Sequence, residues 1–238
     1  MLLYYVRHGD PIYDPDSLTP LGHKQAEALS KRLALYGLDE IYSSTSARTQ
    51  MTAEPICKLL GKNAVLCDWA REDYAWNSFT FPNDNGGRSW GYQLRKIIEL
   101  YNSPEIAALG DTWYDHPCFK DTNIKKGMLT VHDSVDGFML SLGFKHDRAL
   151  KGYRKMKDSG KRIALFAHEG FGFAFLSSLL DIPYPFFCTH FALSHSSMTV
   201  IHFNEKDDFI YPKILQHSND SHLYKEGILT GYNNEINV

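Results

Sequence analysis

Several features that would indicate other classes of protein are absent from this sequence. No apolar run approaches the ~18 residues that a membrane-spanning helix needs, and no charged-then-apolar signal segment opens the chain. The four cysteines among 238 residues are scattered, without CxxC spacing, which favours reduced thiols over a disulfide framework. We therefore expect a cytoplasmic protein that does not associate with a membrane.

The sequence also lacks an excess of positive charge. It has 25 Lys and Arg against 28 Asp and Glu, a formal net charge of −3, which argues against nucleic acid as the main partner. Neither a Gly-x-Ser-x-Gly elbow nor a Gly-x4-Gly-Lys-Ser/Thr loop occurs, which removes the commonest serine hydrolases and nucleotide-binding loops. The eleven histidines lack the spacing of metal ligands, so we predict no metal and no cofactor.

The first nine residues carry the strongest local signal. Residues 2–6 (LLYYV) form an apolar, β-prone run typical of a strand covered on both faces. The run ends at Arg7-His8-Gly9. If the strand belongs to an open parallel sheet, these residues lie at its carboxyl edge, which is where such sheets bind ligands. Arginine offers a permanently charged fork of donors for phosphate or carboxylate, and histidine offers a nitrogen that is nucleophilic near neutral pH. Gly9 would let a ligand approach the backbone closely.

An alternation of strands and helices follows. The first helix begins after Thr19, a good N-cap, and ends at Gly37, and the second carries Arg48 in its first turn. Strands are expected at residues 38–42 and 64–67. This βαβαβ pattern predicts a parallel sheet with right-handed crossovers. It places Arg48 beside a helix N-terminus at the same edge as His8, and helix N-termini favour anions.

A second strand ends on a histidine. The apolar residues 162–167 lead to His168, Glu169 and a glycine, and an apolar helix is expected over residues 171–180. Residues 198–203 and 211–216 are predicted as two further strands, the last an antiparallel edge. We therefore predict an α/β fold, a three-layer α/β/α sandwich whose mostly parallel sheet has about six strands with one antiparallel edge strand.

The regular pattern breaks at about residues 73–126, a stretch rich in aromatic side chains. Only residues 89–101 indicate a helix there, and a long helical region is expected at 131–157, with a break near 143–146. Insertions of this kind usually cover a site, so we predict one domain over residues 1–238 with a cap at about 73–126 over the carboxyl edge. The aromatic residues line a pocket for the leaving group or form the core of the cap. From residue 219 onward the chain is expected to be irregular.

Two arginines and two histidines that converge at one edge would form an anion pocket. Two doubly donating arginines exceed what a carboxylate needs, so a phosphoryl group is the better ligand. A neutral imidazole can attack phosphorus in line, and a carboxylic acid must then protonate the leaving oxygen.

Four motifs in order resemble those of the histidine phosphatase superfamily, in particular its small bacterial-type branch. They are Arg7-His8-Gly9, Leu18-Thr19 with Gly22 and Gln25-Ala26, the run Ser43-Ser44…Arg48…Thr52-Ala53, and Ala167-His168 before a glycine. Asn219-Asp220-Ser221-His222-Leu223 also resembles a segment near the end of its smaller phosphatases. The resemblance covers residues 1–72 and roughly 131–223 and leaves out the insertion.

The resemblance implies roles for particular residues. His8 would be the nucleophile that becomes phosphorylated, Arg7 and Arg48 would clamp the phosphate, and His168 would stabilise the transition state. The proton donor of the family commonly follows the third strand, which indicates Glu72. Asp73, the next residue, is the alternative donor.

Two departures from the family pattern concern substrate binding. The usual asparagine after Arg-His-Gly is missing, because Asp10-Pro11-Ile12-Tyr13 stands there. Glu169 occupies a place where a small residue is common, and it could turn away, bind a cationic substrate group or carry a proton. Together with Gly9 and the residues of the clamp, Glu169 is predicted to contact substrate. The predicted substrate-binding residues are Arg7, Gly9, Arg48, His168 and Glu169.

The function predicted from these residues is a metal-independent phosphomonoester hydrolase that forms a phosphohistidine on His8 and acts on a small-molecule phosphate ester. Two alternatives stay open at this point. One is a phosphotransferase of the phosphoglycerate mutase type, and the other is a non-catalytic module that binds a phosphorylated ligand on the same fold. Neither the physiological substrate nor the oligomeric state is readable from the sequence, and a homodimer is one option.

Overall fold

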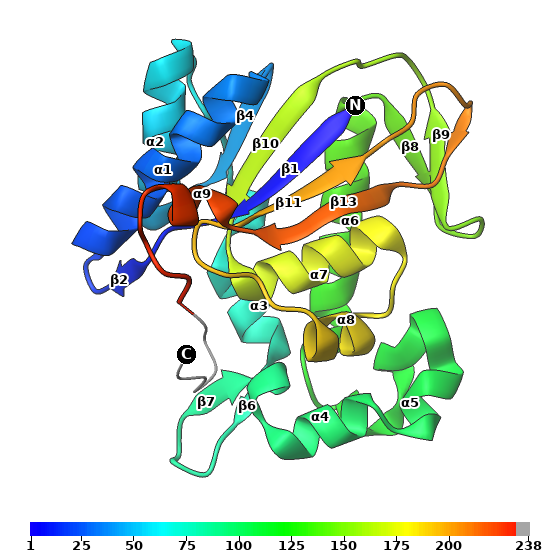
Figure 1. Ribbon diagram of the computed structural model, residues 1–238. Helices are drawn as coiled ribbons and strands as arrows, with labels where there is room; N and C mark the ends of the chain where they lie inside the picture. Colours follow the sequence, from blue (N-terminus) through cyan, green and yellow to red (C-terminus); the bar gives the residue numbers. More distant parts are fainter. Residues whose placement is uncertain (232–238) are drawn as a thin grey trace.

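The computed structural model describes residues 1–231, and its centre is a six-stranded sheet with the order β13-β11-β1-β10-β4-β5 (Figure 1). The strands are β1 (Leu2–Arg7), β4 (Glu40–Ser44), β5 (Val65–Cys67), β10 (Arg162–Ala167), β11 (Met198–His202) and β13 (Lys213–Asn219). Strands β1, β10, β4 and β5 are parallel, whereas β11 pairs antiparallel with β1 and β13 pairs antiparallel with β11. The predicted mixed sheet, with its antiparallel pairing at one edge, is confirmed.

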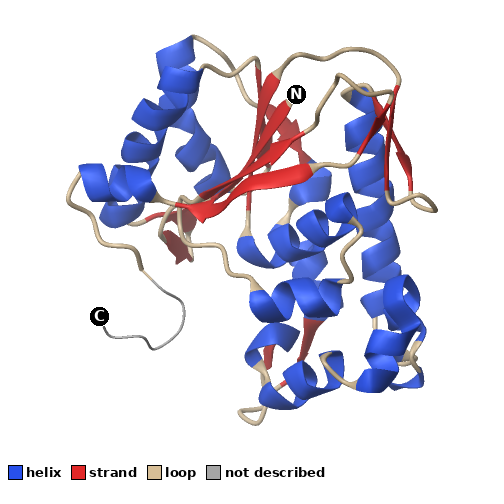
Figure 2. Ribbon diagram, turned by 45° about the vertical axis from the view of Figure 1, so that its right-hand side comes forward, coloured by secondary structure: helices blue, strands red, loops and turns tan. Residues whose placement is uncertain are grey.

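Helices cover both faces of this sheet (Figures 1 and 2). Helices α1 (Pro20–Tyr36) and α2 (Ala47–Leu60) pack on one face, and α6 (Ile124–Ser141) and α7 (Glu169–Leu180) pack on the other. The side chains of β1 alternate between the two resulting apolar cores, as expected for a strand buried on both faces. The predicted three-layer sandwich is confirmed.

The first helix is capped as its sequence predicts. The Thr19 hydroxyl accepts a hydrogen bond from the Gly22 amide at 3.0 Å, Pro20 occupies the first turn, and Gly37 ends the helix with a φ of 71°. Between β1 and this helix, β2 (Pro11–Tyr13) and β3 (Asp16–Leu18) form a short hairpin where the sequence indicates only a loop.

The stretch between β5 and α6 contains more regular structure than its sequence indicates. Its elements are α3 (Glu72–Phe79), β6 (Thr80–Pro82), β7 (Arg88–Trp90), α4 (Arg95–Tyr101), α5 (Pro104–Leu109) and the 3₁₀ turns η1 (Asp68–Ala70), η2 (Gly91–Gln93), η3 (Gly110–Asp115) and η4 (Pro117–Phe119). The prediction that only residues 89–101 are helical is therefore wrong. Elements β6, β7, α4 and α5 lie at the lower end of Figure 1, below α7 and α8 (Tyr184–His190). The division into one domain with a cap stays a prediction.

The long helix expected over residues 131–157 is wrong in its second half. Helix α6 ends at Ser141, and β8 (Phe144–Asp147) and β9 (Gly152–Lys155) form a hairpin that β12 (Phe209–Ile210) extends to three strands. Backbone conformation explains the difference, because Gly143 has a φ of 101° and Lys151 a φ of 54°, both outside the helical region. The tail is not wholly irregular either, since α9 (Ser221–Lys225) lies in it; residues 232–238 are outside the described residues.

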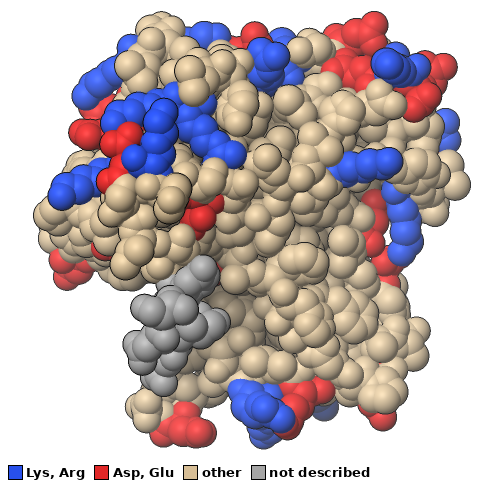
Figure 3. Space-filling model, in the orientation of Figure 1, with Lys and Arg blue, Asp and Glu red and all other residues tan. Residues whose placement is uncertain are grey.

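Charged side chains of both signs lie along the periphery of the face in Figure 3, and much of the middle of that face is uncharged. Within residues 1–231, none of the helices combines the length and the hydropathy that crossing a membrane requires.

Candidate active site

Neighbouring parallel strands bring the two predicted histidines together. Arg7 pairs with Ala167 in the sheet, so His8 and His168 both follow at the carboxyl edge, with ring centroids 5.3 Å apart. Helix α2 begins at this edge and supplies Arg48, whose Nη2 lies 3.1 Å from His168 Nδ1. The sequence prediction that these side chains meet at one edge therefore agrees with the geometry.

His8 is held in one tautomer by its own loop. Its side chain is buried, and Nδ1 lies 2.7 Å from the carbonyl oxygen of Gly9. Because a carbonyl can only accept, Nδ1 carries the proton and Nε2 keeps its lone pair. Burial, then the neighbouring His168 and Arg7, hold the pKa of His8 well below its usual range. The ring is therefore neutral, with Nε2 available as a nucleophile.

The guanidinium of Arg7 is fixed on several sides. Nη1 donates to the carbonyl of Leu193 and lies 3.3 Å from Glu169 Oε2, and Nη2 lies 2.8 Å from His195 Nε2. Glu169 Oε1 in turn accepts from the amide of Leu193 at 3.3 Å. Glu169 therefore turns toward the site and faces Arg7, which answers one of the questions that its position in the sequence raised.

Arg48 is oriented in a similar way by a carboxylate. Its Nη1 lies 2.8 Å from Asp16 Oδ1, and the other oxygen of Asp16 accepts from the Ala47 amide at 2.7 Å. The Nε atoms of both Arg7 and Arg48 are buried and have no hydrogen-bond partner among the described residues. A buried unsatisfied donor costs roughly 1–3 kcal/mol, so both arginines suit an anionic ligand that would satisfy them.

Glu72 begins α3 and lies within the same cluster. Its Oε1 accepts from the Phe171 amide at 3.1 Å, and its Oε2 lies 3.1 Å from His168 Nδ1. Burial raises the pKa of Glu72 to about 7, although the Phe171 amide and Arg48 act against that shift. Asp73 is half exposed and pairs with Arg71 at 2.6 Å. Glu72 thus has the properties of a general acid at neutral pH.

His168 is completely buried and links two other members of the cluster. Burial, then the charges of Arg48 and Arg7, hold its pKa well below the usual range, so the ring is neutral. A guanidinium only donates, so Nδ1 accepts from Arg48, and Nε2 carries the proton toward the Ser44 hydroxyl 3.0 Å away. When Glu72 is protonated, its O–H can donate to the Nδ1 lone pair of His168, whereas the ionised carboxylate would face that lone pair. This contact favours the acid form of Glu72.

These side chains meet at a cavity of about 510 Å³. It is lined by Arg7, His8, Tyr13, Arg48, Glu72, Asp73, Trp76, Trp90, Tyr92, Gln93, Glu169 and Gly170. Of the predicted site residues, His168 and Gly9 are not part of this lining. Gly9 packs against α1 instead, where a Cβ on it would lie 2.7 Å from the carbonyl oxygen of Gly22.

His195 is a site residue that the sequence analysis missed. Its ring lies 5.7 Å from that of His8, it accepts from Arg7 Nη2, and its Nδ1 lies 3.6 Å from Asp10 Oδ1. Burial, then the charge of Arg7, lowers the pKa of His195 to about 3. The residue precedes β11, and because β11 runs antiparallel to β1, the beginning of β11 reaches the edge where β1 ends.

The segment near the end of the chain supports the loop that carries His195. His222 Nε2 lies 3.0 Å from the Ser196 hydroxyl, and Asp220 Oδ2 accepts from the Ser194 hydroxyl at 3.0 Å. The Ser196 amide in turn donates to the carbonyl of His8 at 3.0 Å. The stretch 219–223, which the sequence analysis singled out by resemblance, thus holds a loop that contacts His8.

One group of ligand atoms within the site could hold a cation. His8, Glu72 and His168 each offer an atom, and these atoms lie within 4.8 Å of one another. However, the His168 nitrogen that faces Glu72 also faces the permanent charge of Arg48, and a cation there would be repelled. The charge around the cluster fits an anion better.

Comparison with known proteins agrees with this geometry. Residues 3–77 match the model of the histidine phosphatase superfamily (branch 1). No curated protein matches the chain. Among solved structures, an Entamoeba histolytica phosphoserine phosphatase mutant in complex with phosphoserine is 18% identical, with a TM-score of 0.58 over 93% of this chain and 98% of its own.

Two further structures show the same fold. A mycobacterial glucosyl-3-phosphoglycerate phosphatase in complex with VO3 is 18% identical, with a TM-score of 0.57 over 90% of this chain and 97% of its own. The α-ribazole phosphatase of Shigella flexneri is 15% identical, with a TM-score of 0.57 over 92% and 97%. The family match over residues 3–77 and the shared fold together confirm the predicted resemblance to the histidine phosphatase superfamily.

Proposed function

We propose that this protein is a phosphomonoester hydrolase that forms a phosphohistidine on His8 and acts on a small-molecule phosphate ester. The predicted class of enzyme, a phosphatase, agrees with the family match and with the solved structures that share the fold. The single observation that carries the proposal is the fixed tautomer of His8, whose free Nε2 lies among two arginines and a carboxyl group suited to give up a proton.

In the first step, Nε2 of His8 attacks phosphorus while the bond to the ester oxygen breaks. The bonding electrons go to the leaving oxygen, which takes the proton of Glu72 and departs as an alcohol. Arg7 and Arg48 donate to the non-bridging oxygens, where negative charge is concentrated in the transition state. His168 contacts both Arg48 and Glu72 from behind and orients them. It therefore contributes to the reaction by positioning these two side chains.

In the second step, water attacks the phosphohistidine. Glu72, now ionised, accepts a proton from the water, and the P–N bond breaks to return the electron pair to His8 Nε2. Inorganic phosphate leaves, and both His8 and Glu72 regain their original protonation states. The two steps together consume one water and one phosphate ester, and they release one alcohol and one phosphate.

The proposed reaction needs no metal ion, because the two arginines supply the positive charge that a metal would otherwise supply. We expect hydrolysis to continue at an unchanged rate after dialysis against a chelator. A loss of activity that a divalent cation restores would instead assign the His8, Glu72 and His168 cluster to a metal.

The decisive experiment traps the intermediate. The protein is mixed with a ³²P-labelled phosphomonoester, quenched in alkali, and tested for label that is stable to alkali and labile to acid, with mass spectrometry to locate it. We expect label on His8, none on the His8→Asn variant, and normal labelling of the His23→Asn variant, whose histidine is exposed on α1. A non-catalytic binding module would give no label in any of them.

The mutase alternative needs a different assay, because a phosphotransferase that works through His8 would also be labelled. A mutase returns the phosphate to a second hydroxyl and therefore holds intermediates that carry two phosphates. Among the described residues that line the cavity, the cations are Arg7 and Arg48, and each already pairs with a carboxylate. This charge favours release of phosphate to water. Isomerase activity that depends on a bisphosphate primer would reverse that conclusion.

A further inference from the structure

The walls of the active-site cavity are aromatic. Trp76, Trp90 and Tyr92 come from α3 and the stretch that follows it, and Tyr13 comes from the β2–β3 hairpin. Trp76 and Trp90 meet edge to face with ring centroids 5.1 Å apart, and Trp90 stacks on Tyr92 at 5.7 Å. Segments from distant parts of the chain therefore place four rings around one cavity.

Two of these rings are unusually exposed for aromatic side chains that line a cavity. Tyr13 is 69% exposed and Trp76 is 37% exposed. By contrast, Tyr101 and Trp113, which belong to the core of the same inserted stretch, are buried almost completely. A core role accounts for Tyr101 and Trp113, and Tyr13 lies under the Arg48 guanidinium, 5.4 Å from its ring centroid. Neither role covers the exposed part of Trp76, against which a flat ligand in the cavity would pack.

Trp90 is held rigidly in its position by α7. A Cβ added to Gly170 would lie 2.4 Å from Trp90 Cη2 and 2.7 Å from Glu72 Oε1. Only a residue without a side chain fits there, so the indole lies directly against the helix backbone, next to the proposed proton donor. The aromatic wall is thus part of the same packed unit as the catalytic cluster.

The cavity has no free positive charge among its described lining residues that could pair with a second anion. Arg7 already lies against Glu169 at 3.3 Å, and Arg48 lies against Asp16 at 2.8 Å. The other carboxyl groups on the lining are Glu72 and Asp73, and His8, whose pKa is held well below its usual range, adds no positive charge. One phosphate can compete for the two arginines, but a further carboxylate or phosphate would face carboxylates without a cation of its own.

We propose that the alcohol part of the substrate is a flat aromatic group that carries no second negative charge. This proposal rests on the proposed function, because it concerns the leaving group of the same reaction. The phosphate would lie on Arg7 and Arg48, and the ring would stack against Trp76 and the neighbouring aromatic side chains.

The test uses three synthetic esters whose alcohols have similar acidity. They are 2-phenylethyl phosphate, 2-cyclohexylethyl phosphate and 2-(4-carboxyphenyl)ethyl phosphate. Stacking on aromatic side chains is worth about tenfold in binding, so kcat/KM for the phenyl ester should exceed that for the cyclohexyl ester by about tenfold. The carboxyphenyl ester should be the poorest of the three, because its second anion faces carboxylates.

Trp76→Ala is the informative variant, and Tyr74→Ala is its matched control. Both residues lie on α3 and both are exposed aromatics, but Tyr74 hydrogen-bonds to Asp68 and lines a different cavity. Trp76→Ala should lose about tenfold in kcat/KM on the phenyl ester through KM, with little change on the cyclohexyl ester. Tyr74→Ala should leave the preference for the phenyl ester unchanged.

The outcomes separate this proposal from the proposed function. If His8 is labelled and the esters are hydrolysed, but the phenyl and cyclohexyl esters react at equal rates, only the proposed substrate class is overturned. The same holds if the protein prefers the carboxyphenyl ester. Absence of turnover and of label would overturn the function and this proposal with it. Calorimetric binding of 2-phenylethylphosphonate and 2-cyclohexylethylphosphonate to the His8→Asn protein gives a second measurement, and equal affinities there also contradict the proposal.

Discussion

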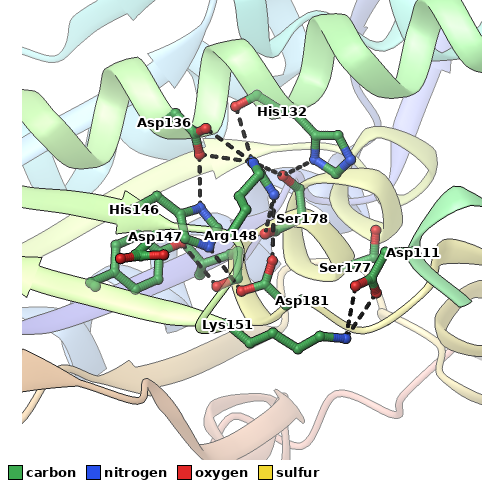
Figure 4. A network of polar contacts seen from close by, with 12 residues as sticks. Asp111, His132, Asp136, His146, Asp147, Arg148, Lys151, Ser177, Ser178 and Asp181 are labelled. Atoms are coloured by element: carbon green, nitrogen blue, oxygen red, sulfur yellow. Dashed lines mark hydrogen bonds and ion pairs between the residues drawn. The ribbon is translucent and has the colours of Figure 1, made fainter.

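Two polar clusters of the protein shift the pKa of a buried histidine in opposite directions. At the carboxyl edge of the sheet, His8 and His168 lie beside Arg7 and Arg48, and the pKa of each ring is held well below its usual range. At the C-terminal end of α7, where Asp181 is the cap residue, His146 lies 2.8 Å from Asp136 and 2.8 Å from Asp181, with Arg148 beside both carboxylates (Figure 4).

The pKa of His146 is raised, although burial acts to lower it, because its hydrogen bonds to Asp136 and Asp181 outweigh that effect. The pKa of a buried histidine is therefore lowered beside arginines and raised between carboxylates. Burial acts to lower the pKa of all three histidines, so the two carboxylates beside His146 account for the difference. Substitutions in one cluster that leave the other cluster intact test this difference.

The largest difference should come from exchanging each histidine for asparagine. His8→Asn removes the proposed nucleophile and should lower kcat by about 10⁴-fold or more, with little change in stability. His146→Asn should leave kcat nearly unchanged in the fraction that stays folded. Steady-state hydrolysis of p-nitrophenyl phosphate, with folding checked by circular dichroism, provides the measurement. Full turnover by His8→Asn would contradict the mechanism.

Glu72→Gln should have the next largest effect. Glutamine cannot give its proton to the leaving oxygen, so kcat on an alkyl phosphate should fall by about 10²–10⁴-fold. The loss should be much smaller with p-nitrophenyl phosphate, because its leaving group departs without a proton. Asp73→Asn serves as the control, since Asp73 is half exposed and paired with Arg71. Equal losses for the two variants would return Asp73 to consideration as the proton donor.

The pH dependence of the rate should report on Glu72. Its pKa of about 7 means that the acid form disappears as the pH rises through neutrality. On an alkyl phosphate, kcat/KM should therefore fall with increasing pH above about 7, by up to tenfold per pH unit. The decline should be weak or absent in Glu72→Gln. An alkaline limit that persists in that variant would have to come from another group.

Much of the active cluster was predictable because it follows from local patterns. A strand that ends on histidine occurs twice in the sequence, and parallel neighbours in a sheet bring such ends to one edge. Arg48 follows from the position of a helix N-terminus, and Glu72 followed from the resemblance. Of the four, only His8 and His168 follow from which strands are parallel neighbours.

The residues that were missed depend on strand direction and on contacts between distant segments. His195 reaches the site because β11 is antiparallel to β1, and its neighbours in sequence show no sign of that. The hairpin at β8 and β9 replaced a predicted helix because His146 stacks on Tyr153 across the strands at 4.1 Å. Tyr153 also donates to the carbonyl of Leu179 in α7, and His146 contacts Asp181 just beyond that helix. Tertiary contacts of this kind override local propensity.

The smallest predicted change lies in the stability of the His146 cluster. His146 has a raised pKa, so its contribution is complete below the unfolded value of about 6.5 and is lost as the pH rises through the folded value. Asp136 has a lowered pKa, because His146 and Arg148 outweigh its burial, so its contribution is complete above about 3.9 and is lost as the pH falls. The network should therefore be most stabilising between about pH 4 and pH 6.5.

His146→Asn should accordingly lower the free energy of unfolding by about 3 kcal/mol at pH 5.5, because it removes one partner of a buried ion pair. The loss should be smaller at pH 9, because the contribution of a histidine with a raised pKa declines as the pH rises. His132→Asn is the matched control: burial and Arg148 lower the pKa of His132 to about 4, so its effect should be the same at both pH values. Urea denaturation of the three proteins at the two pH values decides the matter. If His146→Asn lowers the free energy of unfolding equally at both pH values, the ring stabilises the protein by packing and not by charge. The contrast between the two clusters would then rest on His8 and His168 alone.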